Sequence, residues 1–144
     1  MTVAREMLDA SPVPIELGAG AVASAIDAAM VCAQACTSCA NSCLAEDDVA
    51  EMSHCIALCD DCADVCETTL RVLSRPFGSD DLVTHRVLKA CVRACTNSAE
   101  ECDRHAAHHH HCAVCAKACR ACLHACQALL DTETFRELEK LAGA

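Results

Sequence analysis

The apolar residues of this chain recur with the period of an α-helix, and in four segments the repeated apolar residue is cysteine. In each segment a first cysteine is followed by positions four, seven and eleven residues later. At 3.6 residues per turn these offsets stay within about 60° of one another around the helix axis, so each set forms one stripe. The four sets are Cys32, Cys36, Cys39 and Cys43; Cys55, Cys59, Cys62 and Cys66; Cys91, Cys95, Ser98 and Cys102; and Cys115, Cys119, Cys122 and Cys126. The pattern predicts four helices that each carry a stripe of thiols, with Ser98 as the one position that lacks sulfur.

Helix-breaking and capping residues separate these segments. Pro12 and Pro14 set off a short amphipathic segment at the N-terminus, and the loop around Pro76 and Gly78 divides the chain in the middle. We expect Ser79 to cap the helix that follows this loop. The predicted helices cover residues 15–44, 48–74, 80–105, 108–130 and 133–142, and the last of these is expected to pack outside the others.

Short connections make consecutive helices antiparallel. The sequence therefore predicts an all-α protein, an antiparallel up-down-up-down four-helix bundle with short extra helices at the N- and C-termini. We expect a single domain over residues 1–144, with the bundle core at 15–130 and the four stripes facing inward.

Antiparallel packing of the stripes predicts four layers of side chains across the bundle, over a length of roughly 16 Å. The layers are Cys32, Cys66, Cys91 and Cys126; Cys36, Cys62, Cys95 and Cys122; Cys39, Cys59, Ser98 and Cys119; and Cys43, Cys55, Cys102 and Cys115. We call this predicted stack the thiol column.

The two ends of the thiol column differ in chemistry. One end is followed by apolar residues that we expect to close it, namely Leu70, Leu73, Val87, Leu88, Leu129 and Leu130. The other end, which we call the histidine end, offers Met52, His105, His108, His111 and Cys112. This asymmetry predicts a column that opens at the histidine end.

Composition and charge exclude several classes of partner. The net charge of −10, without a basic patch, argues against a nucleic-acid partner. The first residues show no export signal, and the Ala-rich stretch 18–45 is interrupted by polar residues, so we expect a cytoplasmic protein with no membrane segment. In a reducing cytosol a dense set of cysteines stays as thiols and indicates metal binding rather than disulfides.

Three metal chemistries compete for such thiols. Zinc sites usually mount paired cysteines on loops or knuckles, whereas these pairs lie inside predicted helices. Iron–sulfur clusters meet the same objection, and the repeat is too regular for a single cluster. Sixteen thiolates around four Zn²⁺ would leave a net charge of −8 in the core, whereas sixteen Cu⁺ would leave none. Soft thiolates also select Cu(I), so we expect multiple ions, with about one Cu(I) per cysteine.

The candidate metal ligands are all sixteen cysteines and three histidines. They comprise Cys32, Cys36, Cys39, Cys43, Cys55, Cys59, Cys62, Cys66, Cys91, Cys95, Cys102, Cys112, Cys115, Cys119, Cys122, Cys126, His105, His108 and His111. On a helix that begins near residue 108, His108 and His111 fall on the stripe face, while His109 and His110 point away. Met52 is a weaker candidate, because single methionines usually just pack.

The four stripes, the adjoining His-rich segment and the absent export signal resemble the bacterial cytosolic copper storage proteins. The resemblance covers about residues 15–130 and implies a four-helix bundle that stores Cu(I) in its core. It also implies a homotetramer. Ser98 departs from the regular stripe, and Cys112 adds a thiol at the histidine end.

These observations together predict a binding protein rather than an enzyme, one that sequesters many Cu(I) ions in the cytosol. Its candidate partners are copper ions and a copper chaperone or low-molecular-weight thiol. One alternative is a broader buffer for soft metals that include zinc. The other is a thiol redox protein, which would require an exposed, activated cysteine that this sequence does not single out.

Overall fold

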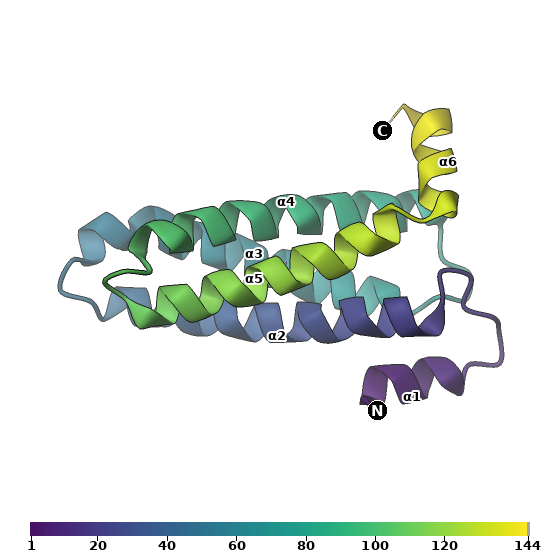
Figure 1. Ribbon diagram of the computed structural model, residues 1–144, viewed down its shortest axis with the longest axis horizontal. Helices are drawn as coiled ribbons and strands as arrows, with labels where there is room; N and C mark the ends of the chain where they lie inside the picture. The colour runs from purple at the N-terminus through teal and green to yellow at the C-terminus, as the bar shows by residue number, and fades with distance from the viewer. Residues whose placement is uncertain (144) are drawn as a thin grey trace.

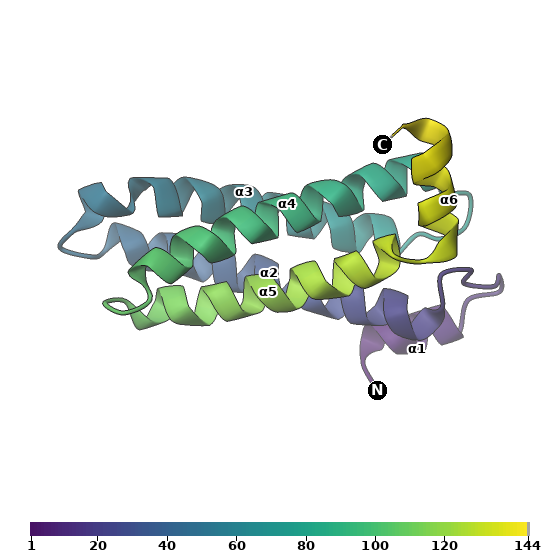
Figure 2. The same cartoon turned by 45° about the horizontal axis from the view of Figure 1, so that its top comes forward.

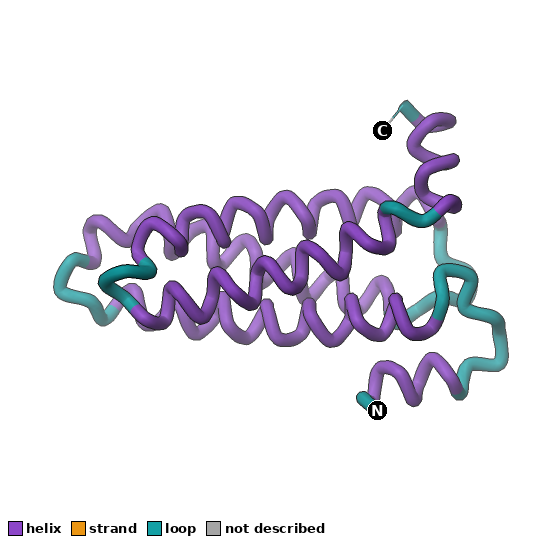
Figure 3. Tube along the Cα trace, in the orientation of Figure 1, coloured by secondary structure: helices purple, strands orange, loops and turns teal. Residues whose placement is uncertain are grey.

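The computed structural model describes residues 1–143, and four long helices in it run antiparallel to one another (Figure 1). The elements are α1 (Val3–Asp9), α2 (Ala19–Leu44), the 3₁₀ turn η1 (Val49–Met52), α3 (Ser53–Leu73), α4 (Asp81–His105), α5 (His110–Leu130) and α6 (Glu133–Ala142). Helices α2 to α5 form the bundle, and short loops join them at alternating ends (Figure 3). The predicted up-down-up-down bundle with short terminal helices is confirmed.

The N-terminus of α4 is capped one residue later than expected. The Asp80 carboxylate accepts hydrogen bonds from the backbone N–H groups of Leu82 (2.9 Å) and Val83 (3.1 Å). Ser79, the predicted cap, instead donates its hydroxyl to the carbonyl of Pro76 at 3.0 Å. A carboxylate at this position also interacts favourably with the helix dipole, which explains why Asp80 takes the role.

Three other helices begin later than predicted, and one of them is α3, which begins at Ser53 rather than residue 48 because η1 precedes it. Gly18 adopts a positive φ of 90°, which turns the chain into α2 at residue 19 rather than residue 15. At α5 the chain forms a turn until His109, so the helix begins at His110 instead of residue 108. This delay moves His108 off the helix.

The bundle core consists of small side chains. All sixteen cysteines are free thiols with at most 1% of their surface exposed. Alanines fill much of the remaining core, and Ala25 and Ala29 of α2 are fully buried. Small side chains let helices approach closely, and a buried free thiol packs as a small apolar group. The interior of the bundle is therefore largely sulfur.

The end of the bundle opposite the histidines is closed by apolar residues. Leu73, Leu88, Leu129 and Leu130 are buried there as predicted, while Leu70 and Val87 are partly exposed. Among the described residues, these side chains and α6 cover this end of the thiol column.

Helix α6 contributes a buried side chain to the core of the protein. It stands across the end of the bundle (Figures 1 and 2) and packs on α4 and α5. Phe135 is 1% exposed, and its ring lies 5.6 Å from that of His85, which is equally buried. An exposed ion pair between Lys89 and Glu139, at 2.9 Å, adds a second link between α4 and α6. The prediction that the last helix packs outside misses this inserted aromatic side chain.

Within the described chain, α2 alone is long and apolar enough to span a membrane by length and composition. Its most apolar window has a mean hydropathy of 1.4. In the structure this helix packs against α1, α3, α5 and η1, and its cysteines are buried in the bundle. Its apolar character therefore has a structural cause in the core.

Candidate metal centre

The thiols of α3 and α4 meet in the predicted register. Cys62 and Cys95 lie 3.6 Å apart (Sγ to Sγ), and Cys55 and Cys102 lie 3.7 Å apart. Cys66 lies 3.9 Å from Cys91. These short contacts arise because the two stripes face each other across the bundle axis.

Helices α4 and α5 also keep the predicted register. Cys91 and Cys126 lie 3.8 Å apart, and Cys119 lies 3.5 Å from the Ser98 hydroxyl. Ser98 is fully buried, so it occupies a place in the column as the pattern predicts.

The predicted register of α2 is wrong by about one helical turn. Cys32 contacts Cys62 (3.8 Å), Cys95 (3.9 Å) and Cys119 (3.7 Å). The predicted layer instead placed Cys32 with Cys66, Cys91 and Cys126. The whole stripe of α2 is displaced toward the histidine end.

The asymmetric turn after α2 explains this displacement. The prediction placed Cys43 level with Cys55, as if the turn were symmetric. The returning chain instead forms η1 before α3 begins, and η1 packs against α2. The last turn of α2 is thus met by η1, whose Met52 is fully buried, and α3 begins further along the bundle.

The thiols form several compact groups in which all the ligand atoms lie within 4.8 Å of one another. Among them are Cys32, Cys66, Cys95 and Cys122; Cys32, Cys36, Cys62 and Cys119; Cys39, Cys59, Cys102 and Cys115; Cys91, Cys122 and Cys126; and Cys39, Cys43, His111 and Cys112. Cys32 and Cys122 join three of these groups and Cys39 joins the other two, and a 3.6 Å contact between Cys36 and Cys115 connects the two sets. The arrangement provides a connected array of soft ligands along the bundle axis.

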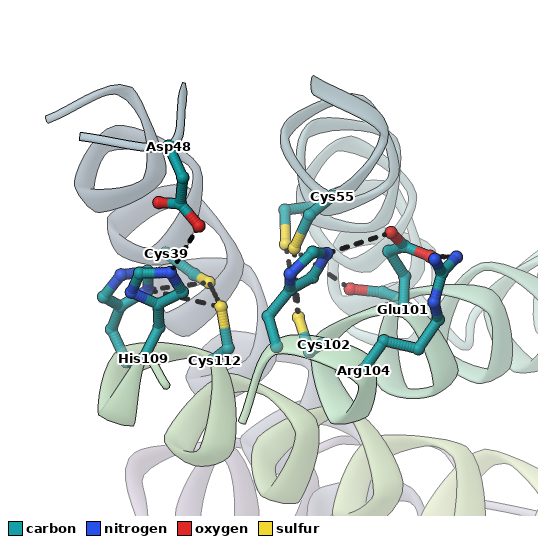
Figure 4. A network of polar contacts seen from close by, with 12 residues as sticks. Cys39, Asp48, Cys55, Glu101, Cys102, Arg104, His109 and Cys112 are labelled. Atoms are coloured by element: carbon teal, nitrogen blue, oxygen red, sulfur yellow. Dashed lines mark hydrogen bonds and ion pairs between the residues drawn. The ribbon is translucent and has the colours of Figure 1, made fainter. Parts of the chain in front are cut away.

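The outermost of these groups includes a histidine. The Nδ1 atom of His111 lies 3.4 Å from Cys39 Sγ and 3.5 Å from Cys112 Sγ. The displacement of α2 gives Cys112 two partners on α2, Cys39 and Cys43, and Figure 4 shows Cys39 and Cys112 side by side. Cys112 therefore belongs to the column rather than lying beyond it.

His109 is a part of this end that the sequence analysis missed. It forms ion pairs with Glu46 and Asp48, the latter at 3.1 Å, and its ring stacks on that of His111 with centroids 5.6 Å apart (Figure 4). His109 was expected to point outward on a helix that begins near residue 108, whereas the helix begins at His110. The acidic pair in the turn after α2 is the signal that could have revealed its partner.

The other two candidate histidines lie differently. His108 is exposed in the turn between α4 and α5. His105 pairs through Nε2 with the buried Glu101 carboxylate at 3.2 Å, and Arg104 binds the same carboxylate at 3.0 Å. Of the three predicted histidines, only His111 is brought into a described thiol group.

Burial controls the protonation of the outer thiols. Burial, together with the nearby Cys43 and Cys102, raises the pKa of Cys112 to about 12. Burial likewise raises the pKa of Cys43. These thiols hold their protons at neutral pH, because a thiolate in a buried environment is costly without a compensating cation.

The ion pair between His109 and Asp48 shifts the pKa values of its two members in opposite directions. The hydrogen bond from His109 lowers the pKa of the Asp48 carboxyl, and the same bond raises the pKa of His109. Both shifts stabilise the charged pair that joins the two turns at this end of the bundle.

A four-helix bundle with a continuous column of buried thiols and a histidine at one end defines a class of helical metal-binding proteins. The model of the copper storage protein family matches residues 19–131. The chain belongs to this family.

Solved structures of a relative agree with this assignment. The copper storage protein Ccsp from Streptomyces lividans, loaded with 10 copper equivalents, is 46% identical with a TM-score of 0.87, over 89% of this chain and 98% of that one. A structure of the cytosolic copper storage protein from the same organism with five coppers is 51% identical with a TM-score of 0.78, over 78% and 94% of the two chains. The uncharacterized cysteine-rich protein YhjQ of Bacillus subtilis is 31% identical over 72% of this chain and 91% of its own length.

Proposed function

We propose that this protein stores Cu(I) in the cytosol, bound as cargo by the thiolates of its core. The observation that carries the proposal is the column of sixteen buried thiols, which come from all four bundle helices and lie in mutual contact. Each thiol loses its proton as a Cu⁺ ion binds, so the core gains no net charge. The copper-loaded relatives support this function.

The overlap between thiol groups favours copper over zinc. Cys32, Cys39 and Cys122 each belong to two groups. Separate tetrahedral Zn²⁺ sites need their own four ligands, whereas Cu(I) accepts fewer ligands and thiolates can bridge adjacent ions. Cu(I) also neutralises the thiolates one for one, which a buried core requires.

The histidine end is the proposed place of uptake. The group of Cys39, Cys43, His111 and Cys112 lies at the outer end of the column, and His111 is only partly buried. His105 and His108 remain proposed ligands whose part in uptake rests on their position beside this end. The opposite end is covered by leucines and Phe135.

The protein acts by binding and not by catalysis on this proposal. A redox-active cysteine must be exposed to its substrate, but each thiol of this chain has at most 1% of its surface exposed. We further propose one domain over residues 1–144 around the bundle at 15–130, a homotetramer, and delivery of copper by a chaperone or a low-molecular-weight thiol. Size-exclusion chromatography with light scattering tests the tetramer directly.

An anaerobic titration tests the proposed function. The apo protein is titrated with Cu(I) and, separately, with Zn(II), each against a competing chelator of known affinity. We expect Cu(I) uptake of about one ion per thiol and weaker retention of zinc. Saturation at about four ions, the number expected for tetrahedral sites, or tighter retention of zinc would overturn the proposal.

A further inference from the structure

Ser98 is the one stripe position without a thiol, and it lies at the centre of the column. Its side chain is fully buried. Its Oγ atom lies 3.5 Å from Cys119 Sγ, 3.6 Å from Cys59 Sγ and 3.8 Å from Cys36 Sγ. Three helices therefore direct sulfur at a hydroxyl supplied by the fourth.

Two compact thiol groups flank this hydroxyl. The inner group consists of Cys32, Cys36, Cys62 and Cys119, and the outer group of Cys39, Cys59, Cys102 and Cys115. Ser98 touches both, through Cys36 and Cys119 of the inner group and Cys59 of the outer group. It thus occupies the boundary between them.

The absence of a thiol at position 98 leaves a long gap between successive thiols on α4. The nearest thiols on this helix are Cys95 and Cys102, which are seven residues apart. Seven residues rise about 10.5 Å along a helix, far more than the sulfur–sulfur contacts of the column. A cysteine at position 98 would divide this span and touch members of both groups.

A serine hydroxyl cannot replace that missing thiolate. It stays protonated near neutral pH and is a hard oxygen donor, whereas Cu(I) selects soft sulfur. In the structure the Cys119 thiol donates to Ser98 Oγ. When copper displaces the thiol protons, the hydroxyl must turn and donate its one proton to a thiolate, so it forms a hydrogen bond where a bridging ligand would otherwise stand.

We propose that Ser98 divides the stored copper into an outer and an inner cluster. The two remain linked on the side of α2 and α5, where Cys36 lies 3.6 Å from Cys115 and 3.5 Å from Cys119. Copper reaches the inner cluster through this link. The division rests on the proposed storage of Cu(I) and concerns how the same site fills.

The decisive variants change sulfur at position 98. Ser98→Cys supplies the missing thiol, and Ser98→Ala is the matched control that removes the hydroxyl without adding sulfur. The double variant Ser98→Cys/Cys126→Ser keeps sixteen cysteines but has no interruption at this layer. Anaerobic Cu(I) loading is followed in time by ultraviolet absorption of the Cu(I)–thiolate bonds, and the ions bound are counted by native mass spectrometry.

The proposal expects two loading phases in the natural protein and in Ser98→Ala. Ser98→Cys should load in one phase and bind roughly one more ion, because soft sulfur now bridges the gap. The double variant should load in one phase with the natural capacity. Two phases retained in Ser98→Cys, or phases merged in Ser98→Ala, would overturn the division.

A second variant keeps the test decisive if Ser98→Cys fails to fold. Cys36→Ser removes the sulfur that contacts both Cys115 and Cys119 in this link, so the second loading phase should slow several-fold while the first keeps its rate. Ser38→Ala, on the exposed face of the same helix, is the control and should slow neither phase. An unchanged second phase in Cys36→Ser contradicts the division, whereas a natural protein that binds only a few ions contradicts storage itself.

Discussion

His111 is a partly buried residue in the outermost thiol group of the column. Its Nδ1 atom approaches two thiols, while the ring stacks on His109 at the outer side. An imidazole nitrogen is a suitable ligand for copper. The buried thiols behind it must first lose a proton. His111 is thus suited to receive an ion before the thiols do.

This position predicts a kinetic role for His111. His111→Ala should slow the uptake of Cu(I) several-fold and leave the capacity almost intact, because the thiols that hold most of the copper remain. His110→Ala is the matched control, since His110 is exposed on the first turn of α5 and is not among the proposed ligands. Stopped-flow mixing with a Cu(I)–chelator complex measures both rates. Equal rates in His111→Ala and the natural protein would exclude uptake through this imidazole.

The raised pKa of Cys112 predicts that copper binding depends on pH. With a pKa of about 12 this thiol is protonated at neutral pH, so a Cu⁺ ion must displace its proton. Each displaced proton makes the binding constant about tenfold larger per unit rise in pH. Competition titrations at two pH values, corrected for the chelator, give the slope. A slope of zero would mean that the outer thiols bind as preformed thiolates.

Residue identity alone predicted that the cysteines lie in the core, but not how the residues at the histidine end are arranged. The twelve-residue stripes place each of their cysteines on an inward face, because the helical period fixes the direction of a side chain within a helix. The directions of His108 and His109 could not be predicted in this way, because the helix begins at His110 and the turn before it has no fixed period. The partner of His109, Asp48, comes from a distant turn that only the folded chain brings near.

At the scale of elements, the register of α2 was the part of the fold that sequence could not supply. The registers of α3 against α4 and of α4 against α5 were predicted correctly. The turn after α2 contains η1, and its 3₁₀ geometry adds length to one side of the turn. An asymmetric turn shifts one helix along its neighbour. The spacing of cysteines within a helix carries no information about that shift.

Helix α6 should be part of the cooperative fold because Phe135 is inserted at the closed end. Phe135→Ala should lower the free energy of unfolding of the apo protein by about 3–5 kcal/mol, through lost burial and the cavity left beside His85. Phe77→Ala is the control, because Phe77 is 82% exposed and should change stability by less than about 0.5 kcal/mol. Denaturant unfolding followed by circular dichroism measures both. A loss below about 1 kcal/mol in Phe135→Ala would show that α6 only rests on the surface.

The ion pair between His109 and Asp48 links the turns at the histidine end in a pH-dependent way. The raised pKa of His109 means that its contribution is complete below its ordinary value of 6.5 and is lost as pH rises through the raised value. The lowered pKa of Asp48 means that its contribution is present above 3.8 and is lost as pH falls through the lowered value. The pair therefore stabilises the fold most between these two ordinary values.

The variant His109→Gln tests this pH window in the apo protein. Its thermal midpoint should fall below that of the natural protein at about pH 5, and the two midpoints should converge once the pH exceeds the raised pKa of His109. His110→Gln, an exposed neighbour on the first turn of α5, is the control and should show no such dependence. A difference that stays constant across pH would assign the effect of His109 to packing instead of charge.

At the scale of the whole molecule, copper loading should stabilise the fold. The column exists only when the four helices are packed, so ions bind the native state and shift unfolding by mass action. We expect the thermal midpoint to rise with each addition of Cu(I) and to return to the apo value when a strong Cu(I) chelator removes the metal. Differential scanning calorimetry under anaerobic conditions measures the shift. A midpoint independent of loading would mean that copper binds outside the packed column.

We expect the closed end and the histidine end together to determine the order in which copper ions enter and leave the column. A column with one opening behaves as a stack, in which the last ions received are the first that can be returned. On the proposed passage of copper through the histidine end, copper held near Leu88 and Leu129 is a long-term reserve and copper near His111 is a working fraction. The position of an ion along the bundle thereby sets how soon the cell can recover it.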